Sequence, residues 1–116
     1  MAELRVERRP EGAEEQAAVF ALVGDLTVER LEDVEATLGA ALEGRARHLV
    51  LDLAQLDFID SASVGGLLHL GQRQGRAGSR LLLCAPRPSF QRLLDASGLL
   101  GIFTVHPDVG TALATL

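Results

Sequence analysis

Residues 48–70 read HLVLDLAQLDFIDSASVGGLLHL, and this stretch decides the fold class. Its first part, His48–Leu53, is nearly continuous apolar sequence, which is typical of a strand covered on both faces. A helix then begins at Asp60 or Ser61, which are both good N-cap residues, and its inward apolar residues are Val64, Leu67 and Leu68. A buried strand followed by an amphipathic helix indicates an α/β fold.

On both sides of this stretch the sequence continues to alternate between strand and helix patterns. Residues 3–7 alternate between charged and apolar side chains, and a more apolar strand at Ala17–Val23 follows the turn residues 10–12. Apolar residues then step by three and four from Val28 to Leu42, which predicts a helix with Thr27 as its N-cap and Gly44 at its end. Further along, we expect the helix exit at Gly75 and Gly78, a strand at Leu81–Ala85, a helix from Pro88 to Gly98, a strand at Ile102–Val105 and a helix from Pro107-Asp108.

These elements predict a single α/β domain over residues 1–116. The first two strands are so close in sequence that we expect them to pair antiparallel, with the first strand at a sheet edge. The later strands alternate with helices, which favours parallel pairing and right-handed crossovers. The predicted order is ββαβαβαβα, which gives one mixed sheet with about four packed helices.

The composition limits the chemistry that the chain can perform. Its 116 residues include 16 acidic and 11 basic residues, for a net charge of −5, and every basic residue is arginine. Without lysine there is no Schiff-base lysine, no P-loop lysine and no lysine general base. The acidic balance argues against nucleic acid as a partner, and the absence of Trp and Tyr argues against base stacking.

The sequence predicts no cofactor, metal site or membrane insertion. Cys84 lies in an apolar strand and is expected to be a buried free thiol. No pair of Cys or His residues has the spacing of metal ligands, and no apolar run reaches the roughly 18 residues of a membrane span. The amino end lacks the apolar run of a signal peptide, so we expect a cytoplasmic protein.

Polar residues are concentrated at positions 57–66, where a strand gives way to a helix and α/β folds often form sites. A response-regulator receiver is excluded, because it needs a lysine on a later strand and an acidic pair after the first strand. A serine hydrolase needs a Gly-x-Ser-x-Gly elbow and a histidine base, but the elbow is missing and His48, His69 and His106 form no triad pattern. A capped helix without further chemistry is the plain alternative.

Ser61 is suited to another chemistry, because it stands at a helix start beside carboxylates. A phosphate there would add about −1.5 to −2 charge, which the dipole and free N–H groups of the helix would tolerate. A partner docked over the helix start would instead face an unpaired charge, at a cost of about 3–5 kcal/mol. The cluster is therefore well suited to a binding switch.

Three motifs resemble those of STAS domains, especially bacterial anti-sigma factor antagonists. The first is Leu51–Leu53 followed by FIDSASVG at residues 58–65. The second is LVGDL at residues 22–26, before the first helix, and the third is LLDASGL at residues 93–99, which closes the third helix. The motifs occur in the family's order and span essentially the whole chain.

The resemblance implies a protein that is not an enzyme and acts in a partner-switching circuit. Unphosphorylated, such an antagonist binds an anti-sigma factor that is also a serine kinase, and so frees a sigma factor for transcription. The kinase phosphorylates the serine after the signature aspartate, here Ser61, and a metal-dependent serine phosphatase reverses this. ATP and metals therefore belong to the partners. The implied partner-binding residues are Gly24, Asp25, Thr27, Asp60, Ser61, Ala62, Ser63, Val64 and Gly65.

Two motifs depart from the family pattern. The usual Ser-Ser-Gly is Ser61-Ala62-Ser63, which makes Ser63 a second candidate acceptor. The usual Gly-Glu-Leu-Asp is Gly24-Asp25-Leu26-Thr27, which lacks the second carboxylate. The alternatives are a small STAS subunit of a lipid-transport ABC complex and a non-phosphorylated scaffold, and exposed apolar residues on the edge strand would support a weak homodimer.

Overall fold

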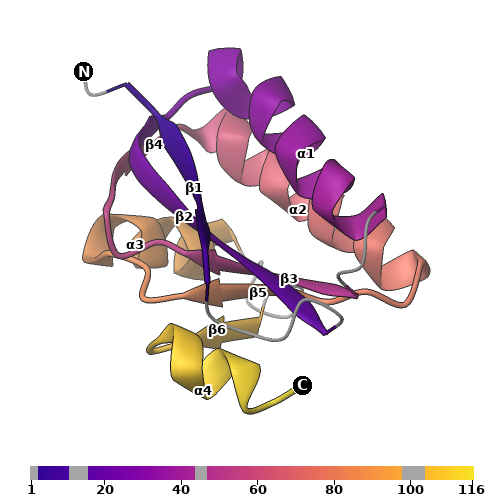
Figure 1. The fold of residues 1–116 in the computed structure, drawn as a ribbon. Coiled ribbons are helices and arrows are strands. Elements are labelled where there is room, and N and C mark those ends of the chain that lie inside the picture. Colours follow the sequence, from indigo (N-terminus) through magenta and orange to yellow (C-terminus); the bar gives the residue numbers. More distant parts are fainter. Residues whose placement is uncertain (1–2, 11–15, 44–46, 98–103) are drawn as a thin grey trace.

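The computed structural model describes residues 3–10, 16–43, 47–97 and 104–116. In this part of the chain a mixed sheet carries helices on both faces (Figure 1). Its strands are β1 (Arg5–Arg9), β2 (Ala17–Leu26), β3 (His48–Asp52), β4 (Leu56–Ile59), β5 (Leu81–Cys84) and β6 (Thr104–His106). Its helices are α1 (Val28–Glu43), α2 (Ser61–Arg76), α3 (Pro88–Ser97) and α4 (Val109–Leu113).

The strand pairing confirms the predicted mixed sheet. The strands follow the order β1-β2-β3-β5-β6, and β1 lies at an edge, antiparallel to β2. The pairs β2–β3, β3–β5 and β5–β6 are all parallel, as the alternation of strands and helices predicts.

The predicted order ββαβαβαβα is wrong at one point, because it lacks β4, and the observed order is ββαββαβαβα. This strand has only 4 residues, and its burial does not alternate: Leu56 and Ile59 are buried, whereas Asp57 and Phe58 are exposed. It continues the line of β3 after a short turn and pairs in parallel with the end of β2, with a register shift between Gly24 and Asp25. A four-residue strand without period-two burial gives no clear sequence signal.

The sheet separates two hydrophobic cores of unequal size, because successive strand residues point to opposite faces. The larger core lies under α1, α2 and α3 and includes Phe20, Leu51 and Leu67. The smaller core lies under α4 and includes Val50 and Cys84. Figure 1 shows α4 on the opposite side of the sheet from α1 and α2.

The helix boundaries agree with the predictions wherever the structure describes them. Helix α2 ends between the two expected glycines, and Gly78 adopts a φ of +83° there. Several predicted boundary residues lie outside the described residues: Glu11 and Gly12 of the first turn, Gly44, Gly98, and the first residues of the last strand, Ile102 and Phe103.

Candidate functional site

Asp60 joins the starts of α1 and α2. Its Oδ1 accepts a hydrogen bond from the N–H of Ser63 at 2.8 Å, so Asp60 is the N-cap of α2. Its Oδ2 accepts from the N–H of Val28, the first residue of α1, at 3.0 Å. Its own N–H donates to the carbonyl of Leu26 at 3.2 Å. One carboxylate therefore satisfies a free N–H group at each of two helix starts.

These contacts favour the charged form of Asp60. The Ser63 side chain lies against the carboxylate, outside regular hydrogen-bond geometry, and together with the N–H groups of Ser63 and Val28 it lowers the pKa of Asp60. Partial burial opposes this shift. Both helices also direct their positive dipole ends at this carboxylate, which favours the same charged form.

Ser61 is the first residue of α2, and its side chain is exposed. It lines a groove of about 640 Å³ between the β4–α2 connection and α3. We call this the Ser61 groove; its lining residues are Phe58, Ile59, Asp60, Ser61, Ser89, Arg92, Leu93 and Ala96. Its charged lining residues are one acid, Asp60, and one base, Arg92. The groove thus brings the Ser61 hydroxyl, one carboxylate and one guanidinium to the same part of the surface.

The predicted partner-binding residues separate into an exposed and a buried set. Ser61, Ala62 and Gly65 are exposed, and Thr27 and Asp60 are half-buried. The other four are buried: Gly24, Asp25, Ser63 and Val64. The second set can shape the surface but offers little side-chain area to a partner.

Ser63 is fully buried, with 0% of its surface exposed, and its Oγ has no hydrogen-bond partner among the described residues. This burial argues against Ser63 as a kinase acceptor in the folded chain. The sequence contains a signal for the burial of Ser63. The buried residues of α2 follow helical spacing from Ser63 through Leu67 and Leu70 to Gln74.

Two exposed apolar side chains near Ser61 were missed in the sequence. Val28 is 55% exposed at the start of α1, and Phe58 is 47% exposed in β4, where it lines the Ser61 groove. Val28 was expected on the inner face of its helix, but it is the first residue of α1 and precedes the apolar residues that face the core. Phe58 could not be assigned to a face without knowledge of β4. An apolar surface beside a polar helix start is typical of a protein-binding site.

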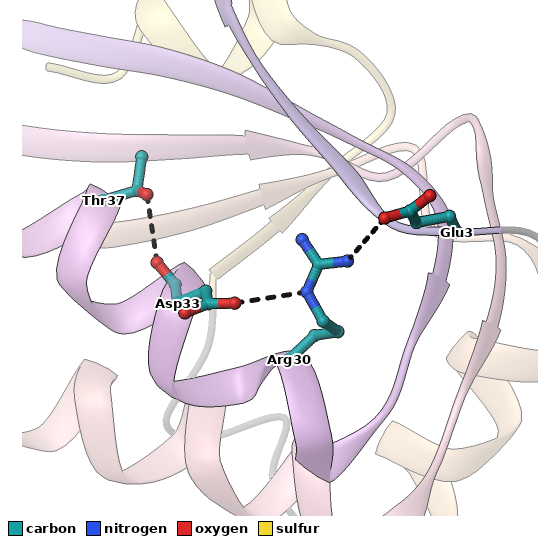
Figure 2. A network of polar contacts seen from close by, with 4 residues as sticks. All are labelled: Glu3, Arg30, Asp33 and Thr37. Atoms are coloured by element: carbon teal, nitrogen blue, oxygen red, sulfur yellow. Dashed lines mark hydrogen bonds and ion pairs between the residues drawn. The ribbon is translucent and has the colours of Figure 1, made fainter.

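The first turns of α1 add an acidic border to this surface. Glu29 and Glu32 are exposed there. The guanidinium of Arg30 is held by two acids, since its NH1 lies 3.6 Å from Glu3 Oε1 and its Nε donates to Asp33 Oδ2 at 3.3 Å (Figure 2). The net character of this helix start is therefore acidic.

Other candidate chemistry is not gathered into a site. The three histidines lie on β3, α2 and β6. The N–H of Arg80 donates to His48 Nδ1 at 2.9 Å, and burial, with smaller effects from Arg80 and Arg47, lowers the pKa of His48. Within the described ranges no group of three His, Cys, Asp or Glu side chains could hold a metal ion. Among the helices of these ranges, none combines the length and the apolar character that a membrane span needs.

Cys84 is a buried free thiol, as predicted. Burial raises the pKa of Cys84 to about 12, with smaller contributions from the charges of Asp52 and Asp108. The thiolate that a nucleophile would require is therefore disfavoured.

The chain matches the family model of the STAS domain over residues 9–112. It is 32% identical to BtrV of Bordetella bronchiseptica over 87 residues, which are 75% of each chain. It is 30% identical to the anti-sigma F factor antagonist of Paenibacillus polymyxa over 99 residues, 84% of this chain and 85% of the relative. In fold it is similar to the anti-sigma factor antagonist SpoIIAA in its unphosphorylated form, with a TM-score of 0.77 at 21% identity, over 97% of this chain and 95% of that one. The phosphorylated form of SpoIIAA from Bacillus gives a TM-score of 0.71 at 22% identity, over 97% and 98% of the two chains. Motifs, fold and relatives agree, and the chain belongs to the STAS domain family.

Proposed function

We propose that this chain is an anti-sigma factor antagonist, and that phosphorylation of Ser61 switches off its binding to an anti-sigma factor kinase. The observation that carries the proposal is the exposure of Ser61 at the start of α2, close to the exposed apolar side chains of Val28 and Phe58. The names of the curated relatives support the antagonist role over a transporter subunit. The two forms of SpoIIAA show that a protein of this fold is phosphorylated.

In the unphosphorylated state, the partner covers the surface around Ser61. Burial of Val28 and Phe58, each now about half exposed, would contribute about 1 kcal/mol or more per side chain. The acidic residues Glu29 and Glu32 would face basic groups of the partner, which raises the association rate more than the final affinity.

Phosphorylation then places charge inside the contact surface. The phosphate adds about −1.5 to −2 charge beside an ionised Asp60, and the partner cannot leave that charge unpaired without losing about 3–5 kcal/mol of binding energy. The fold tolerates the change, because Ser61 is exposed and stands at a positive helix end. The chain is thus a substrate of the kinase and the phosphatase, and these partners supply ATP, metal ions and catalysis. We place it in the cytoplasm, where a sigma factor acts.

A phosphorylation assay tests the acceptor. The chain is incubated with radiolabelled ATP, Mg²⁺ and the anti-sigma factor kinase from the same genome. We expect incorporation of phosphate into the wild type and no incorporation into Ser61→Ala. Ser89→Ala is the matched control, because Ser89 is an exposed serine in the same groove, and it should be labelled like the wild type. Full labelling of Ser61→Ala would show that the acceptor is another residue.

A binding assay tests the switch. Ser61→Asp should weaken binding to the kinase by about 10²- to 10³-fold, whereas Gln72→Glu, which makes the same charge change at an exposed position about three turns along α2, should have a much smaller effect. Circular dichroism confirms that both variants are folded. Co-purification with a transporter ATPase that neither Ser61→Ala nor Ser61→Asp affects would contradict the proposal and support the transporter alternative.

A further inference from the structure

We infer that Arg92 of α3 binds the phosphate group once Ser61 is phosphorylated, and this inference rests on the proposed function. Both residues line the Ser61 groove, Ser61 from the start of α2 and Arg92 from the wall that α3 forms. The groove has a volume of about 640 Å³, and the long side chain of arginine can extend into it from α3.

The charges around Ser61 create the need for a cation. A phosphate at this position stands next to Asp60, whose hydrogen bonds keep it ionised, and neighbouring groups of like charge repel. The start of α2 compensates only in part, because the N–H of Ser63 already donates to Asp60. The N–H of Val28 at the start of α1 also donates to Asp60. Arg92 is the basic residue that lines the groove.

Arg92 is also available for this role. Its side chain is exposed, and it has no ion pair among the residues that the structure describes. By contrast, Arg87, the residue before α3, donates to Asp57 at 2.6 Å. The acid one turn along from Arg92, Asp95, accepts a hydrogen bond from Gln91 at 3.1 Å. A guanidinium is planar and can bind a phosphate through two parallel hydrogen bonds, so Arg92 is chemically matched to a phosphoserine.

The pairing changes how the switch works. In the unphosphorylated chain the groove is open beside Phe58, and Arg92 faces the partner as a free cation. In the phosphorylated chain the phosphate and Arg92 together bridge α2 and α3 across the groove. The partner then loses a docking groove and a cation, besides meeting a new negative charge.

The titration of the phosphate tests this pairing without the kinase. Phosphoserine is incorporated at position 61 during translation, and its second pKa, about 6 when unperturbed, is measured by ³¹P NMR. A paired arginine stabilises the dianion, so Arg92→Gln should raise this pKa by about 0.3–0.7 units. Arg92→Lys, which keeps the charge and loses the two-point contact, should give a smaller rise. The other charged group of the groove, Asp60, stays ionised over this pH range.

Arg76→Gln is the matched control. It makes the same charge change in the last turn of α2, about 22 Å along the helix from Ser61 and beyond the Debye length of about 10 Å at 0.1 M salt. We expect no shift of the phosphate pKa in this variant. Equal shifts in Arg92→Gln and Arg76→Gln, or no shift in either, would overturn the inference; if Arg92→Gln does not fold, Arg92→Lys decides between the same outcomes.

The two proposals fail in different ways. If Arg92→Gln raises the phosphate pKa but the kinase binds the phosphorylated and unphosphorylated chains equally, the pairing stands and the switch is wrong. If the kinase discriminates between the two forms while Arg92→Gln leaves the pKa unchanged, the switch stands and the role of Arg92 is wrong.

Discussion

At the scale of single residues, the surface around Ser61 depends on Asp60 and Gly24, which each lie against the backbone of other segments. Asp60 binds the first turns of α1 and α2 through separate oxygens. Gly24 adopts a φ of +104°, and a Cβ there would lie 2.5 Å from the carbonyl oxygen of Glu3. Only glycine combines this backbone conformation with so close an approach. Both residues were expected to contact a partner, and the structure gives each of them a role in shaping the chain.

Replacement of the Asp60 carboxylate should destabilise the fold by an amount that depends on how many of its hydrogen bonds are lost. Asp60→Asn keeps one acceptor oxygen for Ser63 but turns an amide donor towards the N–H of Val28, so we expect a loss of about 0.5–1.5 kcal/mol. Asp60→Ala loses both contacts and should cost about 1–3 kcal/mol. Urea unfolding measures both values. Asp108→Asn is the control, because Asp108 caps α4 through Thr111 alone and asparagine caps equally well. The double contact is refuted if the two asparagine variants lose the same stability.

Gly24→Ala should destabilise the fold by about 2–4 kcal/mol, because strain at a positive φ adds to the clash with the Glu3 backbone. Gly65→Ala is the matched control. Gly65 lies within α2, and a Cβ there would meet nothing within 4 Å, so alanine should stabilise the helix by about 0.5–1 kcal/mol. Thermal unfolding of both variants measures the difference. A Gly24→Ala variant as stable as the wild type would show that the amino-terminal segment moves aside freely.

At the scale of secondary-structure elements, the site is formed where two strands and three helices meet. The ends of β2 and β4 pair in parallel, so the helices that follow them, α1 and α2, start side by side. Farther along, Gly66 of α2 lies against the side chain of Leu31 on α1, and the missing side chain allows this close packing. Helix α3 packs against β4 and closes the Ser61 groove. The short strand β4 therefore positions α2 beside α1 and provides the surface against which α3 packs.

Truncation of Phe58 in β4 should affect binding more than stability. The side chain is about half exposed, so Phe58→Ala should weaken kinase binding by about tenfold or more and lower the free energy of unfolding by less than about 1 kcal/mol. Isothermal titration calorimetry and urea unfolding provide the two measurements. Gln72→Ala, at an exposed position about three turns along α2, is the control and should change neither. Unchanged binding in Phe58→Ala would remove the groove from the contact surface.

The elements differ in how far the sequence predicts them. Helix α1 and strands β2, β3 and β5 follow from periodicity and long apolar runs, since each is long enough or buried enough to leave a pattern. Strand β4 leaves none, because four residues with an exposed aromatic do not alternate. At the site, Asp60 and Ser61 follow from capping chemistry. The presence of Arg92 in the same groove as Ser61 does not, because it depends on how α3 packs against β4 and not on local sequence.

At the scale of the whole molecule, the sheet separates the site from the opposite face. The site lies beside α1, α2 and α3 over the larger core, while α4 covers the smaller core behind the sheet. The net charge of −5 is carried in part by the exposed acids of α1. This arrangement allows one face to exchange partners while the other face remains packed.

The pH dependence of stability is also a property of the whole molecule. Asp60 and Asp108 have lowered pKa values, so the stability that they provide is present above pH 3.8 and is lost as the pH falls through their folded values. His48 also has a lowered pKa, because it is partly buried and near Arg80; its contribution is present above pH 6.5 and is lost as the pH falls from there towards its folded value. Stability should therefore decrease in two stages on acidification.

Urea unfolding between pH 8 and pH 3 measures these stages. His48→Gln can still accept the hydrogen bond from Arg80 but does not titrate, so it should remove the stage below pH 6.5 and leave the stage below pH 3.8. An identical slope in the wild type and His48→Gln between pH 6.5 and pH 5 would assign the first stage to another group.

The burial of Cys84 makes it possible to measure local opening of the sheet. The chain has one cysteine, fully enclosed in the core beneath α4, and its thiol has a pKa of about 12. Alkylation requires an accessible thiolate, so an added iodoacetamide reagent reacts only in the moments when this side of the sheet opens. The rate of alkylation therefore reports how often the face opposite Ser61 opens. Measured with and without a partner, this rate would show whether the binding that we propose at one face of the sheet alters opening of the other face.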